Sequence, residues 1–146
     1  MVALKEVDMY NFNDIVNLQR ESVQYVGAPE YVLAEAYIYR SDSTACGIYS
    51  GDTPVGLVII RDRPEDGYPY SFTGLFIADD FQRKGLGQEA VEAIMNKFRA
   101  EGLRDSVEIQ VNQSNIPAKK IYRRCGFKEI QRANWNPDFI VMRAEL

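Results

Sequence analysis

The stretch Phe81-Gln82-Arg83-Lys84-Gly85-Leu86-Gly87 leads directly into an amphipathic run over residues 88–101. Gly85 and Gly87 lack a Cβ atom, so a ligand can approach the backbone closely where the helix begins. The N–H groups of a first helical turn have no partner within the helix and lie at the positive end of its dipole, which favours phosphate binding. Arg83 and Lys84 add positive charge. We therefore predict an anion site at the start of this helix, formed by residues 82–88.

The same glycines also fit the relaxed dinucleotide fingerprint G-x-G-x-x-G/A, over residues 85–90. In a dinucleotide-binding fold, however, the glycine loop leaves its strand almost at once. Here a polar and basic segment, residues 79–84, separates the glycines from the apolar run 72–77, and the chain is short. These features argue against a dinucleotide site. A plain loop-to-helix transition, with glycines that serve only as turn residues, stays open on this stretch alone.

A second motif covers residues 115–127 and reads Asn-x-x-Ala-x-x-Ile-Tyr-x-x-x-Gly-Phe. Asparagine at its start and glycine at its end are common at the two ends of a helix, and Pro117 is tolerated in a first turn. We expect a helix of about three turns here. Four side chains recur at helical spacing and form its inner face: Ala118, Ile121, Tyr122 and Cys125. On this spacing alone, Tyr122 is a core tyrosine.

The two motifs, in this order and at this separation, resemble those of the Gcn5-related N-acetyltransferases, the GNAT family. In that family the glycine motif binds the pyrophosphate of acetyl-coenzyme A, and the tyrosine of the second motif lies beside the thioester sulfur. The resemblance implies that Tyr122 protonates the departing thiolate, and that a backbone N–H within residues 75–77 polarises the thioester carbonyl. It implies a cofactor site formed by Leu75, Phe76, Ile77, Gln82, Arg83, Lys84, Gly85, Leu86, Gly87, Gln88, Asn115, Lys119 and Tyr122.

The remaining patterns agree with this resemblance along nearly the whole chain. We expect strands near residues 2–8, 44–49, 54–61, 70–77, 106–111, 127–133 and 139–144, and further helices near 11–24, 29–39 and 88–101. This β-α-α-β-β-β-α-β-α-β-β order is that of the GNAT acyl-CoA N-acyltransferase fold. The expected fold is therefore α/β (α+β), with a mixed central sheet of about seven strands and about four helices. Residues 1–146 should form one domain.

The composition narrows the chemistry. The chain has 146 residues, 46% of them hydrophobic, with two cysteines and no histidine. Histidine bases and imidazole metal ligands are thereby excluded, and we expect no metal site. No apolar stretch approaches the length of a membrane span, and the first ten residues do not resemble a secretory signal, so we expect a cytoplasmic protein without a membrane partner. A homodimer stays open.

The charges divide the chain into two unequal halves. Residues 1–80 carry 13 acidic and 5 basic side chains, net −8, whereas residues 81–146 carry 8 acidic and 12 basic ones, net +4. A basic C-terminal half suits coenzyme A, with Lys119, Arg123 or Arg124 reaching the 3′-phosphate, and an acidic N-terminal half suits a cationic amine. Solvation of the surface explains any single charge outside the glycine loop equally well. The overall acidity argues against nucleic-acid binding.

An alkylamine with a pKa of about 10.4 is almost entirely protonated at pH 7, which costs about 4.6 kcal/mol unless a base removes the proton. Glu108 is the preferred candidate for this base, because it lies in the predicted strand just before the helix of Tyr122. Some family members carry a glutamate two positions further along, where this chain has Gln110. Glu35 on the second helix is an alternative. Surface ion pairing would also account for both glutamates.

The acceptor is the least determined part. The runs 46–58 and 127–146 look most like those of bacterial spermine/spermidine acetyltransferases, although Phe72-Thr73-Gly74 stands where those enzymes carry an acidic or arginine-bearing segment. We therefore expect an N-acetyltransferase that moves the acetyl group of acetyl-CoA to a primary amine of a small, polyamine-like cation. Aminoglycosides, protein N-termini and a non-catalytic acetyl-CoA-binding module stay open as alternatives.

Overall fold

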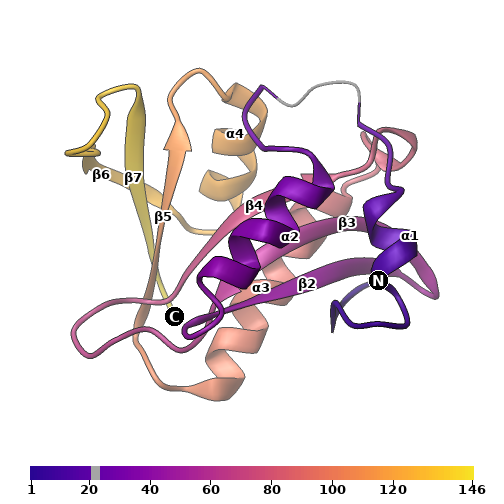
Figure 1. Cartoon of the computed structure of the whole chain (residues 1–146). Coiled ribbons are helices and arrows are strands. Elements are labelled where there is room, and N and C mark those ends of the chain that lie inside the picture. Colours follow the sequence, from indigo (N-terminus) through magenta and orange to yellow (C-terminus); the bar gives the residue numbers. More distant parts are fainter. Residues whose placement is uncertain (21–23) are drawn as a thin grey trace.

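The computed structural model describes residues 1–20 and 24–146, in which seven strands and four α-helices follow one another in the expected order (Figure 1). The strands are β1 (Val2–Glu6), β2 (Ser43–Ser50), β3 (Thr53–Arg61), β4 (Ser71–Ile77), β5 (Ser106–Asn112), β6 (Lys128–Arg132) and β7 (Phe139–Glu145). The helices are α1 (Phe12–Val16), α2 (Pro29–Ile38), α3 (Leu86–Glu101) and α4 (Ile116–Arg124), with a short 3-10 helix η1 (Asp79–Phe81) before α3.

The strands form two antiparallel sheets, one in the order β1-β2-β3-β4 and one in the order β5-β7-β6. A single parallel bridge between Tyr70 and Val107 joins them. The Tyr70 N–H donates to the Ser106 carbonyl (3.1 Å) and the Glu108 N–H donates to the Tyr70 carbonyl (2.9 Å). Beyond this bridge β4 and β5 part toward α4, as Figure 1 shows. The expected central sheet is therefore split by a wedge-shaped opening.

Tyr70 fixes the closed end of this wedge. Its side chain is fully buried, and its ring stacks on Phe98 of α3 with centroids 4.2 Å apart. Its hydroxyl accepts a hydrogen bond from the Leu103 N–H (3.0 Å) just after α3. The same residue thus ties β4, β5 and the end of α3 together, so the angle between the two sheets is set by packing.

A β-bulge bends β4 where it borders the wedge. Leu57 of β3 lies opposite Phe76, but Ile59 lies opposite Thr73, so β4 has one residue more than β3 over this interval. Gly74 takes up the extra length with a φ of +66°, a conformation that side chains rarely adopt. A Cβ atom at this position would also lie 3.1 Å from Val32 of α2. Bulges re-aim the residues beside them, which here border the opening.

The helices cover opposite faces of the strands (Figure 1). The core under α3 and α4 contains the apolar face of α3. This helix is capped at its C-terminus by Gly102, whose φ is +67°. A second core under α1 and α2 contains Ile15, Val32 and Ala36. Within the described part of the chain, no helix is long and apolar enough to cross a membrane.

The prediction of a helix over residues 11–24 is wrong in its extent, because α1 ends at Val16. The Gln19 carbonyl accepts a hydrogen bond from the Asp79 N–H (2.9 Å), and the Arg20 guanidinium donates to the Gly27 carbonyl (2.6 Å). These tertiary contacts replace helical ones after Asn17. Residues 21–23, the later part of the predicted helix, lie outside the described residues.

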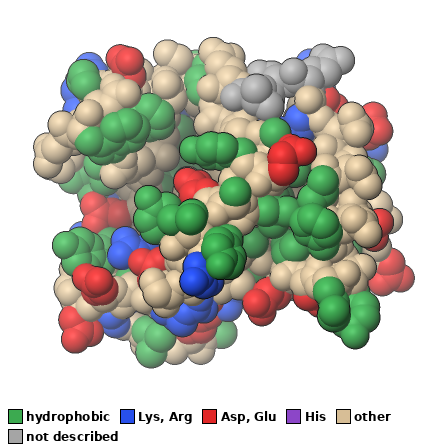
Figure 2. Space-filling model, in the orientation of Figure 1, with side chains coloured by type: hydrophobic (Ala, Val, Ile, Leu, Met, Phe, Trp, Pro, Cys, Tyr) green, Lys and Arg blue, Asp and Glu red, His purple; other side chains and the backbone are tan. Residues whose placement is uncertain are grey.

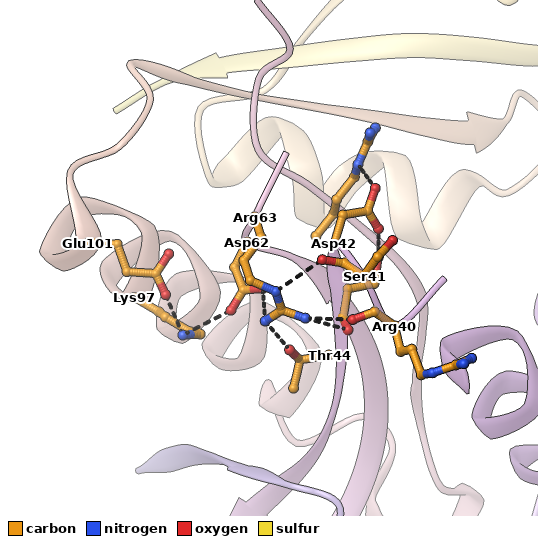
Figure 3. Close-up of polar contacts among 10 residues, drawn as sticks. Arg40, Ser41, Asp42, Thr44, Asp62, Arg63, Lys97 and Glu101 are labelled. Atoms are coloured by element: carbon orange, nitrogen blue, oxygen red, sulfur yellow. Dashed lines mark hydrogen bonds and ion pairs between the residues drawn. The ribbon is translucent and has the colours of Figure 1, made fainter. Parts of the chain in front are cut away.

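Arg63 fixes the chain between α2 and β2 to the end of β3, as Figure 3 shows. Its Nη2 donates to the carbonyls of Arg40 (3.0 Å) and Ser43 (2.9 Å). Its Nη1 donates to the Thr44 hydroxyl (2.9 Å). These bonds connect the end of β3 to the segment that follows α2.

Candidate active site

The glycine loop connects β4 to α3 through backbone conformations that few residues adopt. Arg83 has a φ of +62° and Gly85 a φ of +79°. The Gln82 side-chain amide donates to the Ile77 carbonyl (2.9 Å), which holds the loop against the end of β4. Helix α3 begins at Leu86 without a side-chain cap. Its first N–H groups are therefore not capped by the side chain of the residue before the helix, which the proposed anion site requires.

Glycine is required at the two positions of the loop for different physical reasons. A Cβ atom at Gly85 would meet nothing within 4 Å, so open space and a positive φ characterise this position. A Cβ atom at Gly87 would lie 3.1 Å from Ile121 of α4. Gly87 therefore allows α3 and α4 to pack closely, a role that the motif alone does not reveal. Gly85 is the glycine that borders the predicted phosphate position.

The basic side chains of the loop and of α4 are in different situations. Arg83 and Lys84 are exposed beside the start of α3. On α4, Lys119 Nζ lies 3.4 Å and Arg123 Nη2 2.7 Å from the Glu129 carboxylate. The hydrogen bond from Arg123 lowers the pKa of Glu129 below its usual value. Glu129 thus offsets part of the positive charge that the sequence assigns to phosphate binding at α4.

Tyr122 lines a cavity of about 120 Å³ in the opening between β4 and β5. Its ring packs edge-on against Phe72 (5.9 Å between centroids) and lies 5.8 Å from Phe127. Burial, with a smaller contribution from Cys125, raises the pKa of Tyr122 to about 12. The phenol therefore stays protonated at neutral pH, and its hydroxyl makes no hydrogen bond with the part of the chain that the structure describes. It can act as a donor, not as a base.

The bulged part of β4 forms the wall opposite Tyr122. Thr73, Gly74 and Leu75 line the cavity, whereas Phe76 packs into the core under α2. Along residues 71–77, β4 pairs with β3 alone, so the backbone groups on its other edge face the opening. Asn115, which also lines the cavity, accepts a hydrogen bond from the Ala118 N–H (3.3 Å) and caps α4.

A larger groove, the α2 groove, opens from this cavity between α2 and the loop that joins β6 to β7. Its volume is about 490 Å³. It shares its floor, Phe72, Thr73, Gly74 and Gln110, with the cavity of Tyr122. Figure 2 shows hydrophobic side chains gathered over the α2 side of this face. The groove is lined by Tyr25, Val26, Gly27, Tyr31, Val32, Glu35, Ser71, Phe72, Thr73, Gly74, Gln110, Trp135 and Phe139.

The two candidate bases lie on different sides of this region. Glu108 lines a neighbouring groove of about 440 Å³ that shares Ser71, Gln110 and Trp135 with the α2 groove. Its carboxylate lies 3.9 Å from Arg143 Nη1. Glu35 lines the α2 groove itself. Neither glutamate lines the cavity of Tyr122.

Several residues of the grooves escape the sequence analysis. Tyr31 and Phe139 belong to segments assigned only to a helix and a strand, Tyr25 lies between the two predicted N-terminal helices, and Trp135 lies between the last two predicted strands. Trp135 is the single tryptophan of the chain and is 65% exposed. A tryptophan within a polar Asn-Trp-Asn-Pro turn is the one signal that could have marked this side of the site. Among the described residues, no cluster of histidine, cysteine, aspartate or glutamate is suited to a metal ion.

Residues 12–127 match the Acetyltransferase (GNAT) family. The chain belongs to the GNAT family. The relationship to a curated GNAT protein is distant: the uncharacterized N-acetyltransferase YvbK of Bacillus subtilis is 25% identical over 101 residues. That alignment covers 68% of this chain and 61% of YvbK, less than two thirds of the relative's length.

Solved GNAT structures share the fold at low identity. The aminoglycoside acetyltransferase AAC(6')-Ib in complex with coenzyme A has a TM-score of 0.81 and 17% identity, over 99% of this chain and 95% of that chain. Spermidine N-acetyltransferase from Vibrio cholerae, in complex with CoA and spermine, has a TM-score of 0.77 and 16% identity, over 99% and 95% of the two chains.

These likenesses confirm the predicted GNAT fold. Membership confirms the predicted class, acetyltransferases that use acetyl-CoA, at the level of the family. One of these solved neighbours is an aminoglycoside acetyltransferase and the other is a spermidine N-acetyltransferase. The shared fold therefore leaves the acceptor of this chain undetermined.

Proposed function

We propose that this chain, acting as one catalytic domain over residues 1–146, transfers the acetyl group of acetyl-CoA to a primary amine. One observation carries the proposal. The phenol of Tyr122 and the bulged part of β4 line the same cavity, and the uncapped start of α3 follows the same strand. Pyrophosphate at α3 would let the pantetheine arm run along β4 toward Tyr122.

The glycine loop supports the proposed cofactor site. The N–H groups of the first turn of α3, with Arg83 and Lys84 beside them, would bind the pyrophosphate. Leu86 and Gln88 would border the pyrophosphate, and the backbone of Leu75, Phe76 and Ile77 would contact the pantetheine arm, as the family resemblance implies. Lys119 would reach the 3′-phosphate only if the phosphate competes with Glu129, its present partner at 3.4 Å.

The proposed reaction is direct attack of the amine nitrogen on the thioester carbonyl carbon. A C–N bond forms, the C–S bond breaks, and the products are the N-acetylated amine and coenzyme A. Backbone donors on β4 would stabilise the developing oxyanion, typically the largest contribution of such a site. Tyr122 would donate its proton to the departing sulfur, and the proton that the nitrogen loses as the amide forms would restore the phenol through solvent.

The raised pKa of Tyr122 limits what its proton can contribute. Transfer from a phenol of pKa about 12 to a thiolate whose conjugate acid has a pKa of about 8.5 is uphill by about 5 kcal/mol. An unperturbed tyrosine would face only about 2 kcal/mol. Tyr122 therefore acts chiefly by hydrogen bonding to the sulfur, and full proton transfer is the smaller part of its role.

Glu108 is the proposed base. It lies outside the cavity of Tyr122 but in a groove that shares Ser71, Gln110 and Trp135 with the α2 groove. It would accept the proton of the ammonium group through water before the amine reaches the thioester. Glu35 would instead bind the ammonium ion as the acceptor enters, since it lines the α2 groove directly.

The acceptor proposed on this basis is a small primary amine that is cationic when free. A polyamine is the expectation from sequence, and an aminoglycoside or a protein N-terminus is an alternative within the same reaction. A non-catalytic module that only binds acetyl-CoA is the alternative from another class. The position of Tyr122 in the cavity, which it lines together with residues of β4, favours catalysis over binding alone.

Two measurements test the proposed function. Calorimetry with acetyl-CoA and with NAD should show binding of the former only, because the glycine loop is joined to an unpaired strand edge and not to a dinucleotide crevice. Release of free thiol should then depend on an added primary amine. Binding of acetyl-CoA without thiol release across a panel of amines would leave the binding module as the better description.

A further inference from the structure

The α2 groove has aromatic walls that come from distant parts of the chain. One wall carries Tyr31 of α2 and Tyr25, and the other carries Trp135 and Phe139 at the β6–β7 loop. Phe72 of β4 forms part of the floor. Tyr31 is 64% and Trp135 65% exposed, so neither ring serves to fill the core of the protein. Exposed rings that face each other across a groove are typical of a binding site.

The rings are held in place by contacts with one another and with the surrounding chain. Trp135 donates its indole N–H to the side-chain carbonyl of Gln110, and its ring lies 4.8 Å from that of Phe139. Tyr25 donates its hydroxyl proton to the Ser114 carbonyl (3.1 Å). A Cβ atom at Gly27 would lie 2.6 Å from the Tyr31 ring, so glycine lets that ring pack against the backbone. Such anchoring reduces the entropy lost on binding.

The groove carries little of the negative charge of the N-terminal half. Glu35 lines it, and its carboxylate makes no hydrogen bond or ion pair within residues 1–20 and 24–146. A side groove next to it contains Asp42, which is paired with Arg61 at 2.9 Å. A polyamine with several ammonium groups would therefore find one unpaired carboxylate. A single ammonium group matches this groove better.

We propose that the acceptor is a primary amine with one ammonium group carried on an aromatic body, an arylalkylamine. The carboxylate of Glu35 binds the ammonium ion, while Tyr31 and Trp135 contact the aromatic ring from opposite walls. Aromatic pairs contribute about 0.5–1.5 kcal/mol beyond burial, and a cation over a ring a similar amount, so the two walls suffice for a preference of about tenfold or more. This inference rests on the proposed acetyl transfer and narrows its acceptor.

The groove can be tested by binding, independently of catalysis. The chain has one tryptophan, so the tryptophan fluorescence of the protein reports on Trp135 alone. Addition of 2-phenylethylamine to the protein with coenzyme A should change this fluorescence at concentrations at least about tenfold lower than 1-butylamine or spermidine does. Equal concentrations for the three amines, or tighter binding of spermidine, would overturn the inference.

Variants then assign the preference to particular side chains. In thiol-release assays, kcat/KM for 2-phenylethylamine should exceed that for spermidine, and Trp135→Ala or Tyr31→Ala should reduce the advantage by about tenfold. Tyr37→Ala is the matched control, because Tyr37 is a tyrosine of α2 with the same 64% exposure that does not line the groove. A loss of the advantage in Tyr37→Ala as well would point to α2 packing and overturn the assignment.

Glu35→Gln tests the ammonium site. It should raise KM for 2-phenylethylamine by about tenfold with a smaller change in kcat, whereas Glu30→Gln, an exposed glutamate of the same helix, should change neither. Unchanged KM in Glu35→Gln overturns the role of Glu35. Thiol release that favours spermidine overturns the arylalkylamine inference alone. No thiol release with any amine, while 2-phenylethylamine still changes the fluorescence, contradicts acetyl transfer and leaves the groove's preference standing.

Discussion

The proposed cofactor side and the proposed acceptor side of the site are built in different ways. The cofactor side consists of two continuous segments, the loop from β4 into α3 and the helix α4, and it uses backbone groups, positive φ angles and one tyrosine. The acceptor side consists of side chains from α2, β4, β5 and the β6–β7 loop. The first can be recognised in a linear sequence. The second exists only once the chain has folded.

This contrast agrees with what each side is proposed to bind. Pyrophosphate is met by N–H groups at a helix start, which any sequence with the right glycines supplies. An acceptor is distinguished by the shape and charge of side chains, which can change without changing the fold. The two sides should therefore respond differently to substitution.

Gly85→Val should have the largest effect and should act on the cofactor side alone. A branched side chain would occupy the open space at the start of α3 and weaken acetyl-CoA binding by about 100-fold, the equivalent of two charge-assisted hydrogen bonds. Calorimetric titration with coenzyme A measures this. Amine-induced fluorescence changes at Trp135 should persist.

The matched control is Gly51→Val in the turn between β2 and β3. Gly51 also has a positive φ, +62°, and open space around it, so the strain is comparable but distant from the site. Both variants should lose similar stability, about 1–2 kcal/mol. If Gly51→Val weakens coenzyme A binding as strongly as Gly85→Val, the effect is one of folding and the assignment of the loop is wrong.

Tyr122→Phe should lower kcat by about 10- to 100-fold with little change in the affinity for acetyl-CoA, because only the hydroxyl at the sulfur is lost. Single-turnover measurements of thiol release would show this. A kcat within twofold of the wild type, by the same measurement, would make Tyr122 a core residue and place catalysis wholly on backbone groups.

The same variant has a second consequence at alkaline pH. The folded protein holds the Tyr122 proton up to a pKa of about 12, whereas the unfolded chain loses it near pH 10. Between these values the unfolded state binds fewer protons, so stability falls as pH rises through this window. Denaturant unfolding should show a steeper alkaline loss for the wild type than for Tyr122→Phe. Identical alkaline slopes would indicate that the ring is solvated.

Glu108→Gln sharpens the comparison on the acceptor side. If Glu108 removes the ammonium proton, kcat/KM should fall by about tenfold at pH 7 and much less near pH 10, where the free amine is already abundant. The measurement is the ratio of kcat/KM at pH 7 to kcat/KM at pH 10. Glu145→Gln is the control, because the Glu145 carboxylate pairs with the same arginine, Arg143, at 3.1 Å. A parallel decrease at both pH values would remove Glu108 from the mechanism.

The smallest effect expected is that of salt. Raising the ionic strength from about 0.05 M to about 0.5 M shortens the Debye length to a few ångströms and should increase KM for a monocationic amine by about twofold. The net −8 of residues 1–80 would predict a steeper dependence if it acted as a whole on the groove. A change in KM of tenfold or more would favour the polyamine expectation and the long-range field.

The sequence predicted the order of the seven described strands and four described α-helices, although not the 3-10 helix η1, because these elements carry local signals such as a cap, a turn or a periodic apolar face. It failed where tertiary contacts decide the end of an element. α1 ends early because Gln19 bonds to the Asp79 N–H and Arg20 bonds to the Gly27 carbonyl instead of continuing the helix. The split of the sheet left no trace either, since Tyr70 looks like any buried aromatic residue in a strand.

The site shows the same division. The proposal of a cofactor site at positions 82–88 and 115–122 could be made from the sequence because their spacing is fixed by a loop and a helix. The role of Gly87 could not, because Ile121 is the neighbour that requires it, at 3.1 Å from a would-be Cβ. The rings of Tyr25 and Trp135 come together from opposite ends of the chain, and no local pattern connects them.

The single bridge at Tyr70 has a consequence for cooperativity. Two sheets joined by two backbone hydrogen bonds need not unfold as one unit. The Glu108 N–H in β5 donates one of these bonds, and its acceptor is the carbonyl of Tyr70, the residue just before β4. The stacking of Tyr70 on Phe98 makes α3 the element through which the sheets share their stability. Hydrogen exchange at Glu108 therefore reports whether the halves unfold together. A cofactor bound at the start of α3 would slow that exchange from a distance, since it stabilises the helix on which both sheets depend.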